Sequence, residues 1–283
     1  MGRLWLFGAA LLFSTGGAAI KGNSLTAWQV ASFRSLIAAI MLSLLFPASR
    51  GHWSRRHILL GLCYAATLIT FVASNRLTTS ANAIFLQATA PAYLVVLSPL
   101  LLHERLRRSD FLLLGGCAAG MLLFFMAAEA PRATAPNPSL GNIVALISGF
   151  LWALVMLSMR AMARDSDGDG AGTSMSMVIT GNWLTFLIAL PAALPLPIYR
   201  MHDLLAVLWL GIFQVGFAYV CLTRALQRLP AFEAATLLLI EPAMNPVWTW
   251  LTLGEKPAPL AVAGGAMIVG TTLLNAWWNS TRR

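Results

Sequence analysis

The chain has 283 residues, of which 58% are hydrophobic and 10% are charged, and its mean hydropathy is +0.74. An ordinary soluble domain carries about 25% charged residues, so this composition excludes one. The net charge of +9 could suggest a nucleic-acid partner, because basic patches bind phosphate. The composition therefore predicts a membrane protein and leaves its basic residues to be explained.

Ten apolar windows follow one another along the chain, each long enough to cross a hydrocarbon core of about 30 Å. They cover approximately residues 3–21, 26–46, 57–75, 80–102, 111–127, 140–159, 174–195, 204–223, 231–253 and 259–278. The first window resembles a cleaved signal peptide, with Arg3 ahead of it and Gly17-Ala18-Ala19 near its end. We favour a retained helix, because cleavage would leave an odd number of spans.

The basic residues divide between the ends of these windows. With the N-terminus in the cytoplasm, five fall outside: Lys21, Arg76, Arg132, Arg200 and Lys256. Thirteen fall inside: Arg3, Arg50, Arg55, Arg56, Arg105, Arg107, Arg108, Arg160, Arg164, Arg224, Arg228, Arg282 and Arg283. Cytoplasmic loops of membrane proteins carry such an excess of positive charge. The basicity thus predicts orientation in a lipid bilayer, and we expect no nucleic-acid partner.

Two stretches of the chain echo each other at a spacing of 151 residues. Pro91-Ala92 leads through an apolar run to Glu104-Arg105, as Pro242-Ala243 leads to Glu255-Lys256. Glycines follow each acidic motif at similar spacing: Gly115, Gly116 and Gly120, then Gly264, Gly265 and Gly270. The charge distribution places the first acidic motif inside and the second outside. The echo therefore predicts an internal repeat whose second copy is inverted.

A polar segment, residues 128–139, separates five windows from five and contains three prolines. We expect an all-α polytopic membrane protein of ten transmembrane helices, arranged as two inverted five-helix repeats around a central cavity. The first repeat is residues 1–127, the extracytoplasmic linker is 128–139, and the second repeat is 140–283. In such repeats the substrate site lies near the midplane between the halves.

Small residues spaced four apart let membrane helices approach closely. Gly116 and Gly120 form such a motif, and Ala266 and Gly270 form its counterpart in the second half. We expect them to pack within one protomer, and hence a monomer. A contact between two protomers is the alternative.

No motif in the chain indicates a metal or a cofactor. Four residues match positions 1, 3, 5 and 6 of a calcium loop, namely Asp165, Asp167, Asp169 and Gly170. Position 12 is Ser176 instead of glutamate, so we expect a flexible cytoplasmic connection. The three cysteines fall within windows and predict neither a disulfide framework nor a metal cluster: Cys63, Cys117 and Cys221.

Several motifs resemble one known family. They are Leu239-Ile240-Glu241-Pro242, Leu253-Gly254-Glu255-Lys256, Ala90-Pro91, His103-Glu104-Arg105 and Phe33-Arg34-Ser35-Leu36. Together with the ten windows they resemble the EamA branch of the drug/metabolite transporter superfamily, and most of all YddG-type exporters of amino acids. The resemblance implies a basket-like fold with a central cavity, both termini in the cytoplasm and export by alternating access. It also implies the bacterial inner membrane.

Two ionisable residues lie deep within windows, which makes them functional candidates. Arg34 is about nine residues into the second window and Glu241 about ten into the ninth, so both lie near mid-membrane at 1.5 Å per residue. They could pair with each other. Alternatively Glu241 faces the cavity and binds a substrate ammonium or a proton, and Arg34 is a structural charge. The position equivalent to Glu241 in the first half is Ala90.

Four prolines interrupt the fourth and ninth windows: Pro91, Pro99, Pro242 and Pro246. A proline frees a backbone carbonyl in the preceding turn, which a membrane helix tolerates when neighbours satisfy it. These prolines either fix kinks that shape packing or serve binding and gating.

Further polar and aromatic residues within the windows are candidates for the lining of the cavity. They are Tyr64, Gln87, Tyr93, Trp152, Asn182, Gln214, Tyr219 and Asn245. Amide groups can bond a carboxylate or an ammonium, and Tyr and Trp offer an apolar face with a polar tip. Each of them could equally make an ordinary contact between helices.

The sequence therefore favours a secondary exporter of small metabolites, with amino acids, including aromatic and hydrophobic ones, as its cargo. Proton coupling and facilitated diffusion both remain open, and no P-loop motif indicates ATP. An exporter of lipophilic cations or drugs is the second reading. A lipid-acting intramembrane enzyme is remote, because His52, His57, His103 and His202 form no constellation. A channel is disfavoured because no ring of charges emerges.

Overall fold

A computed structural model describes residues 2–49, 54–102, 108–126, 131, 133–165, 170–195, 200–226, 238 and 240–280. The helices of the first half are α1 (Gly2–Ser14), α2 (Gly16–Lys21), α3 (Ala27–Leu45), the short η1 (Pro47–Ser49), α4 (Arg55–Leu77), α5 (Ser80–Gln87), α6 (Ala90–Leu102) and α7 (Arg108–Met126). Those of the second half are α8 (Pro138–Asp165), α9 (Gly170–Ala193), α10 (Met201–Trp209), η2 (Leu210–Phe217), α11 (Ala218–Leu226), α13 (Ile240–Leu253) and α14 (Pro259–Ser280).

Seven described helical stretches are long and apolar enough to cross a membrane. They are Gly2–Lys21, Ala27–Leu45, Arg55–Leu77, Ser80–Leu97, Pro138–Met159, Ser174–Ala193 and Met201–Ala225. Two shorter apolar helices, Phe111–Leu123 and Pro259–Asn275, occupy the fifth and tenth windows. The ninth window is described only at residue 238 and from residue 240 onward. The fold is therefore that of an all-α polytopic membrane protein, and the number of ten spans stays a prediction.

Short polar side chains satisfy the first turns of several helices, as an environment without water requires. Thr26 forms a capping box with Gln29 at the start of α3. Ser54 accepts from the His57 backbone at the start of α4, and Thr79 accepts from the Asn82 backbone at the start of α5. Each such cap contributes about 1 kcal/mol.

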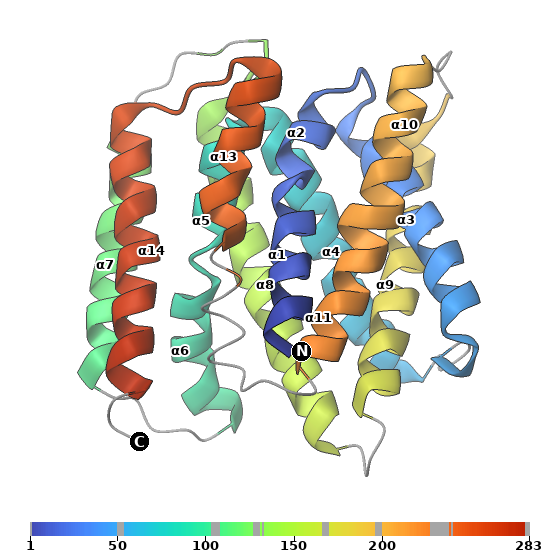
Figure 1. Ribbon diagram of the computed structural model, residues 1–283, viewed down its shortest axis with the longest axis horizontal. Coiled ribbons are helices and arrows are strands. Elements are labelled where there is room, and N and C mark those ends of the chain that lie inside the picture. The colour runs from blue at the N-terminus through green and yellow to red at the C-terminus, as the bar shows by residue number, and fades with distance from the viewer. Residues whose placement is uncertain are drawn as a thin grey trace.

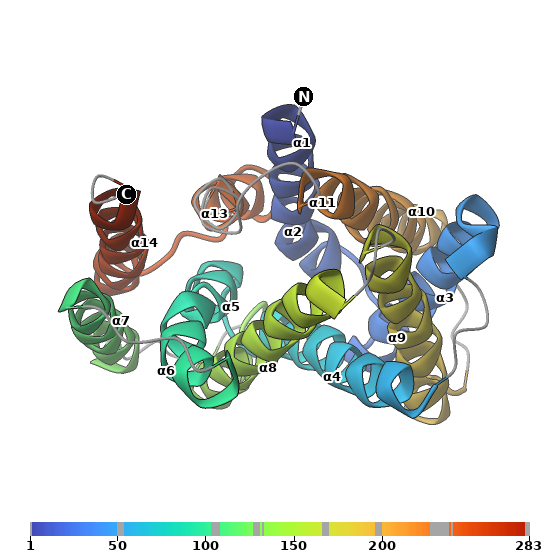
Figure 2. The same cartoon turned by 90° about the horizontal axis from the view of Figure 1, so that it is seen from below.

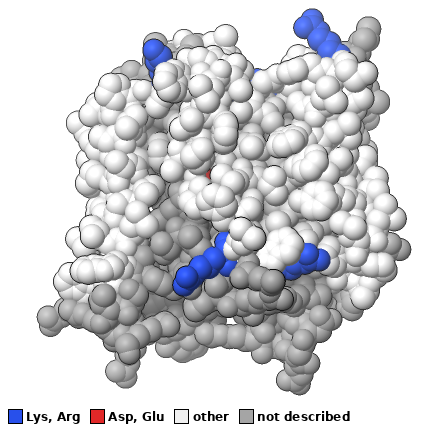
Figure 3. Space-filling model, in the orientation of Figure 1, with Lys and Arg blue, Asp and Glu red and all other residues white. Residues whose placement is uncertain are grey.

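The helices form a bundle of two rows, with α7 and α14 paired at one side (Figures 1 and 2). Figure 2 shows α14, α13, α1, α11 and α10 in one row and α7, α6, α8 and α4 in the other. α4 packs on α8 and α9, α3 packs on α9 and η2, and α1 packs on α11 and α13. Figure 3 shows Lys and Arg near the two ends of this face and almost no charge across its middle. That distribution fits a bundle whose middle faces lipid.

Described members of the two predicted groups of basic residues lie at opposite ends of the bundle. α1 begins and α14 ends toward the same end, the lower one in Figure 1. At that end the Arg224 guanidinium lies 4.9 Å from the centre of the Trp5 ring. At the opposite end Arg76 donates to the backbone and side-chain oxygens of Asn23.

Glycines of α7 permit close packing against α14. A side chain on Gly116 would meet Thr271, and one on Gly120 would meet the Gly264 carbonyl at 2.8 Å. This contact lies within one protomer, as the sequence indicated. The predicted counterpart motif on α14 takes no part in this contact. Ala266 is exposed, and a side chain on Gly270 would meet nothing within 4 Å.

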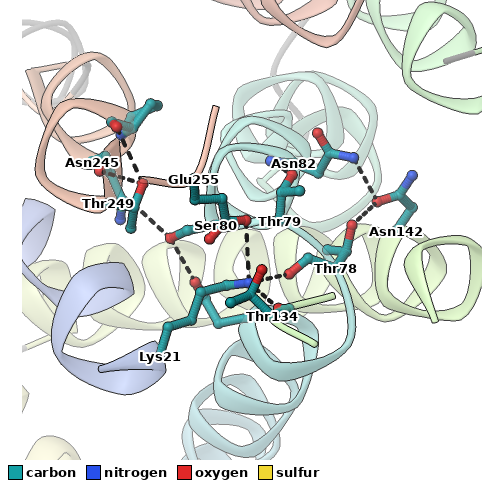
Figure 4. Close-up of polar contacts among 12 residues, drawn as sticks. Lys21, Thr78, Thr79, Ser80, Asn82, Thr134, Asn142, Asn245, Thr249 and Glu255 are labelled. Carbon is teal, nitrogen blue, oxygen red and sulfur yellow. Dashed lines mark hydrogen bonds and ion pairs between the residues drawn. The ribbon is translucent and has the colours of Figure 1, made fainter. Parts of the chain in front are cut away.

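A buried ion pair joins the two halves at the end of the bundle where α2 ends. Lys21 Nζ lies 3.3 Å from Glu255 Oε1, and both side chains are 2% exposed. Lys21 also donates to the Thr78 and Thr134 carbonyls. Glu255 accepts from the Ser80 backbone N–H at 3.1 Å, at the first turn of α5. We call these five residues the Lys21 cluster (Figure 4).

The Lys21 cluster continues into a network of uncharged polar groups. Ser80 Oγ lies 2.7 Å from Asn245 Oδ1 of α13 and 2.9 Å from Asn75 Oδ1 of α4. Gly17 of α2 packs directly on this contact, because a side chain there would strike both Ser80 and Asn245. The network therefore ties α2, α4, α5 and α13 together at this end (Figure 4).

We predict that Lys21→Met destabilises the protein by about 3–5 kcal/mol, because it leaves the buried Glu255 carboxylate without its cation. The double variant Lys21→Met/Glu255→Gln should recover part of this loss. Midpoints of thermal unfolding in detergent micelles measure both changes. If Lys21→Met is as stable as the native protein, the ion pair with Glu255 does not stabilise the fold.

We also predict that Gly120→Val destabilises the protein by about 1–3 kcal/mol, because the added atoms force α7 away from α14. Gly115→Val is the matched control, since a side chain at Gly115 would meet nothing within 4 Å. Thermal unfolding of the two variants compares them directly. Equal midpoints would show that the close approach of the helices contributes little.

Candidate functional site

The fourth predicted span is divided into two helices. α5 ends at Gln87 and α6 begins at Ala90. Thr89 Oγ1 donates to the Leu86 carbonyl at 2.6 Å, and the Ala92 N–H donates to the Thr89 carbonyl at 2.9 Å. Pro91 lies in the first turn of α6, where no backbone donor is required. The sequence predicted a proline-kinked helix, and the structure has a break in mid-span.

The other three prolines occupy different places. Pro242 lies in the first turn of α13, whereas Pro246 lies inside that helix. Pro99 belongs to α6, and its side chain falls outside the described part of the structure. Pro91 and Pro242 therefore share a position near a helix start, and both line the same pocket.

This pocket lies between the α5–α6 break, α8 and α13. Its lining includes Gln87, Pro91, Trp152, Glu241 and Pro242. It is mostly apolar, with Leu94, Met156 and Leu238 among its walls.

A second pocket adjoins the first and shares Gln87, Trp152 and Glu241 with it. Its remaining lining includes Phe13, Arg34, Thr67, Gln214 and Tyr219. We call the two pockets together the central cavity.

Arg34 forms part of the cavity wall through α3. Its side chain is 0% exposed to solvent. Nη1 donates to Gln214 Oε1 and Nη2 donates to the Leu68 carbonyl, each at 3.2 Å. Nε makes no hydrogen bond within the described structure.

Gln214 belongs to η2, a stretch of π-helix in the middle of the eighth predicted span. Such stretches are rare and occur frequently at functional sites. Gly211 allows η2 to approach α3, because a side chain there would lie 2.8 Å from the Arg34 carbonyl. Hydropathy carries no signal for this element, and the sequence analysis missed it.

Glu241 lines both pockets from the first turn of α13. The described structure has no ion pair or hydrogen bond to its carboxylate, so the possible pair with Arg34 is not formed. The two charges nevertheless line one pocket. They are a carboxylate and a guanidinium that share a cavity without neutralising each other.

The predicted aromatic and amide residues divide between the cavity and the walls behind it. Tyr219 lines the cavity and packs edge-on against Tyr64, with ring centroids 5.3 Å apart. Tyr64 is fully buried, and its hydroxyl accepts from Asn182 Nδ2 at 3.2 Å. Tyr64 and Asn182 therefore support Tyr219 from behind. Gln87 lines the cavity and donates to Ser148 at 2.9 Å.

Two more candidates lie away from the cavity lining. Tyr93 packs edge-on against Phe150, with centroids 5.6 Å apart. Asn245 bonds Ser80 beside the Lys21 cluster. Of the nine candidates, the structure thus brings five to the cavity wall: Gln87, Trp152, Gln214, Tyr219 and Glu241.

The described ranges offer few ligands for a metal. These ranges contain no group of three His, Cys, Asp or Glu side chains near enough to bind an ion. Cys63, Cys117 and Cys221 are free thiols. Asp167 and Asp169 of the calcium-like loop lie outside the described residues.

Comparison with known proteins agrees with this architecture. A protein of known crystal structure superposes on 99% of the chain and 98% of its own length, with a TM-score of 0.66 at 20% sequence identity. That likeness shows the fold.

Two relatives are transporters by name. The "pseudopaline exporter CntI" of Pseudomonas aeruginosa is 25% identical over 272 residues, which are 92% of this chain and 90% of the relative. An "uncharacterized transporter" of Clostridium kluyveri is 23% identical over 208 residues, which are 70% of this chain and 64% of that relative's length.

The profile of the EamA-like transporter family matches residues 1–126 and 139–277. These two stretches are nearly the whole chain, and the matches confirm the resemblance drawn from the Pro-to-Glu motifs. The chain therefore belongs to the EamA-like transporter family, whose members are membrane transporters rather than enzymes.

Proposed function

We propose that the protein is a secondary exporter of small metabolites, with amino acids, including aromatic and hydrophobic ones, as its cargo. The observation that carries this proposal is the Glu241 carboxylate in a largely apolar cavity, with no ion-pair partner among the described residues. An ammonium group satisfies such a carboxylate, while Trp152 and Tyr219 offer surfaces for an apolar side chain. The exporter named among the relatives supports the direction of transport.

We propose that the two halves are inverted repeats, residues 1–127 and 140–283, joined by the extracytoplasmic linker 128–139. The helix contacts support this pairing. The third span (α4) packs on the sixth (α8), as the eighth (η2 and α11) packs on the first (α1). The third also packs on the seventh (α9), as the eighth packs on the second (α3). The two family matches fall on either side of the linker.

In the proposed topology both termini are cytoplasmic, the membrane is the bacterial inner membrane, and the protein acts as a monomer of the YddG type. The Lys21 cluster then lies at the extracytoplasmic end. Alternating access requires that end to open for release, so Lys21 and Glu255 have to separate during each cycle. The conformation described here is closed there by their contact.

Purified protein in liposomes tests the cargo. We expect it to move aromatic and hydrophobic amino acids, and Glu241→Gln to lower the rate at least about tenfold, because the ammonium loses a charge-assisted partner. Glu241→Asp, which keeps the charge, should retain part of the activity. If the protein moves lipophilic cations and no amino acids, it is instead an exporter of lipophilic cations or drugs.

Varying the pH gradient separates the two modes of transport. If Glu241 carries a proton, the gradient drives native export, and Glu241→Gln leaves a slower rate that no longer responds to pH. A native rate independent of the gradient would exclude proton coupling and leave facilitated diffusion.

Cross-linking tests the proposed opening. In a variant whose three native cysteines are replaced by alanine, Lys21→Cys and Glu255→Cys are joined by a reducible bifunctional thiol reagent. We expect transport to fall at least about tenfold and to return on reduction, because the outer end cannot open while the link holds. Full transport by the fully cross-linked protein, with the link verified by mass spectrometry, would disprove an opening at this point.

A further inference from the structure

Arg34 is a buried cation with no ion-pair partner among the described residues. The Arg34 side chain has no exposed surface, and its two hydrogen bonds go to neutral acceptors, Gln214 and the Leu68 carbonyl. Its Nε–H has no acceptor in the described structure. A buried charge that lacks an opposite charge is costly, so such groups normally have one.

The other described carboxylates do not supply that charge. Glu255 is held by Lys21. Asp203 is held by the backbone and hydroxyl of Ser24 at 2.7 and 2.6 Å. Glu241 lines the same pocket as Arg34, but no ion pair joins the two in the described residues.

The surroundings hold the guanidinium in place beside the cavity. Gln214 fixes it from η2 and the Leu68 carbonyl fixes it from α4. Both contacts use the terminal nitrogens, while the inner Nε–H stays available and Arg34 lines the pocket that Glu241 also lines. Nη2 carries two N–H groups, and one of them lies on the same edge of the guanidinium as the Nε–H. A guanidinium presents neighbouring N–H groups in the fork geometry that matches a carboxylate.

We propose that Arg34 binds the carboxylate of the cargo and so determines substrate specificity. This inference rests on the proposed function and refines it. The cargo lies across the central cavity with its carboxylate at Arg34 and its ammonium at Glu241. Each charge of the zwitterion neutralises one charge that has no ion-pair partner among the described residues. The aromatic residues between them, Trp152 and Tyr219, contact the apolar side chain.

This arrangement separates zwitterions from organic cations. A cation without a carboxylate can satisfy Glu241, but it leaves Arg34 unpaired and is repelled by it. Discrimination of this kind works by penalising the wrong ligand. Loss of one charge-assisted hydrogen bond corresponds to about 10- to 100-fold in affinity.

The test compares phenylalanine with phenethylamine, the same molecule without the carboxylate, in liposomes that contain the native protein, Arg34→Gln or Arg34→Lys. We expect the native protein to prefer phenylalanine by about 10- to 100-fold. Arg34→Gln should lose most of this preference, chiefly by slower transport of phenylalanine. Arg34→Lys, which keeps a charge without the fork, should fall between the two.

Each outcome decides a different point. Equal loss of both substrates in Arg34→Gln would mean that Arg34 is structural, and an unchanged preference would likewise overturn the proposal. If the native protein moves neither compound, the proposed function itself is wrong, and this inference with it. Should Arg34→Gln fail to fold, the preference of Arg34→Lys decides alone, because a structural charge would leave it at the native value.

Discussion

One constraint governs the central cavity. A bilayer offers no water to a buried charge, so the protein itself or its ligand has to neutralise that charge. Arg34 and Glu241 line one cavity in the membrane-spanning part of the chain, and the described structure gives neither of them a charged partner. If Arg34 and Glu241 formed a purely structural ion pair, their side chains would contact each other. We interpret their separation as room for a molecule that carries both charges.

The Lys21 cluster shows the opposite solution in the same protein. There the cation and the carboxylate meet directly, and backbone groups of Thr78, Ser80 and Thr134 add further hydrogen bonds (Figure 4). The cluster binds the end of the first span to the loop before the last and seals one end of the bundle. The protein thus pairs its charges where helices close and leaves them apart where the cavity lies.

Much of the architecture follows from the sequence because hydropathy and loop charge are averaged properties. The described long helices, the positions of the described basic residues at two ends and membership of the EamA-like family agree with expectation. Features that depend on the direction in which a side chain points do not follow from these averages. Tyr64 and Tyr219 are indistinguishable by hydropathy, yet only Tyr219 reaches the cavity, because Tyr64 packs against Gly181 on the side of α9.

Other features depend on contacts between distant residues. Glu255 was recognised as part of a repeated motif, but its partner Lys21 is 234 residues away, and no local pattern connects them. The break between α5 and α6 and the π-helix at Gln214 replace expected continuous helices. At the break the backbone makes local hydrogen bonds, such as that from the Ala88 N–H to the Ile84 carbonyl, which hydropathy does not register. Arg34 was expected to be structural, and only the geometry of its hydrogen bonds places an open donor beside the cavity.

The most direct test of the central claim is a structure of the protein with an amino acid bound in a lipid nanodisc. The account predicts a cargo carboxylate within about 2.7–3.2 Å of the Arg34 guanidinium and its ammonium at a similar distance from Glu241. A loaded structure in which Arg34 and Glu241 pair with each other, and the cargo lies elsewhere, would contradict it.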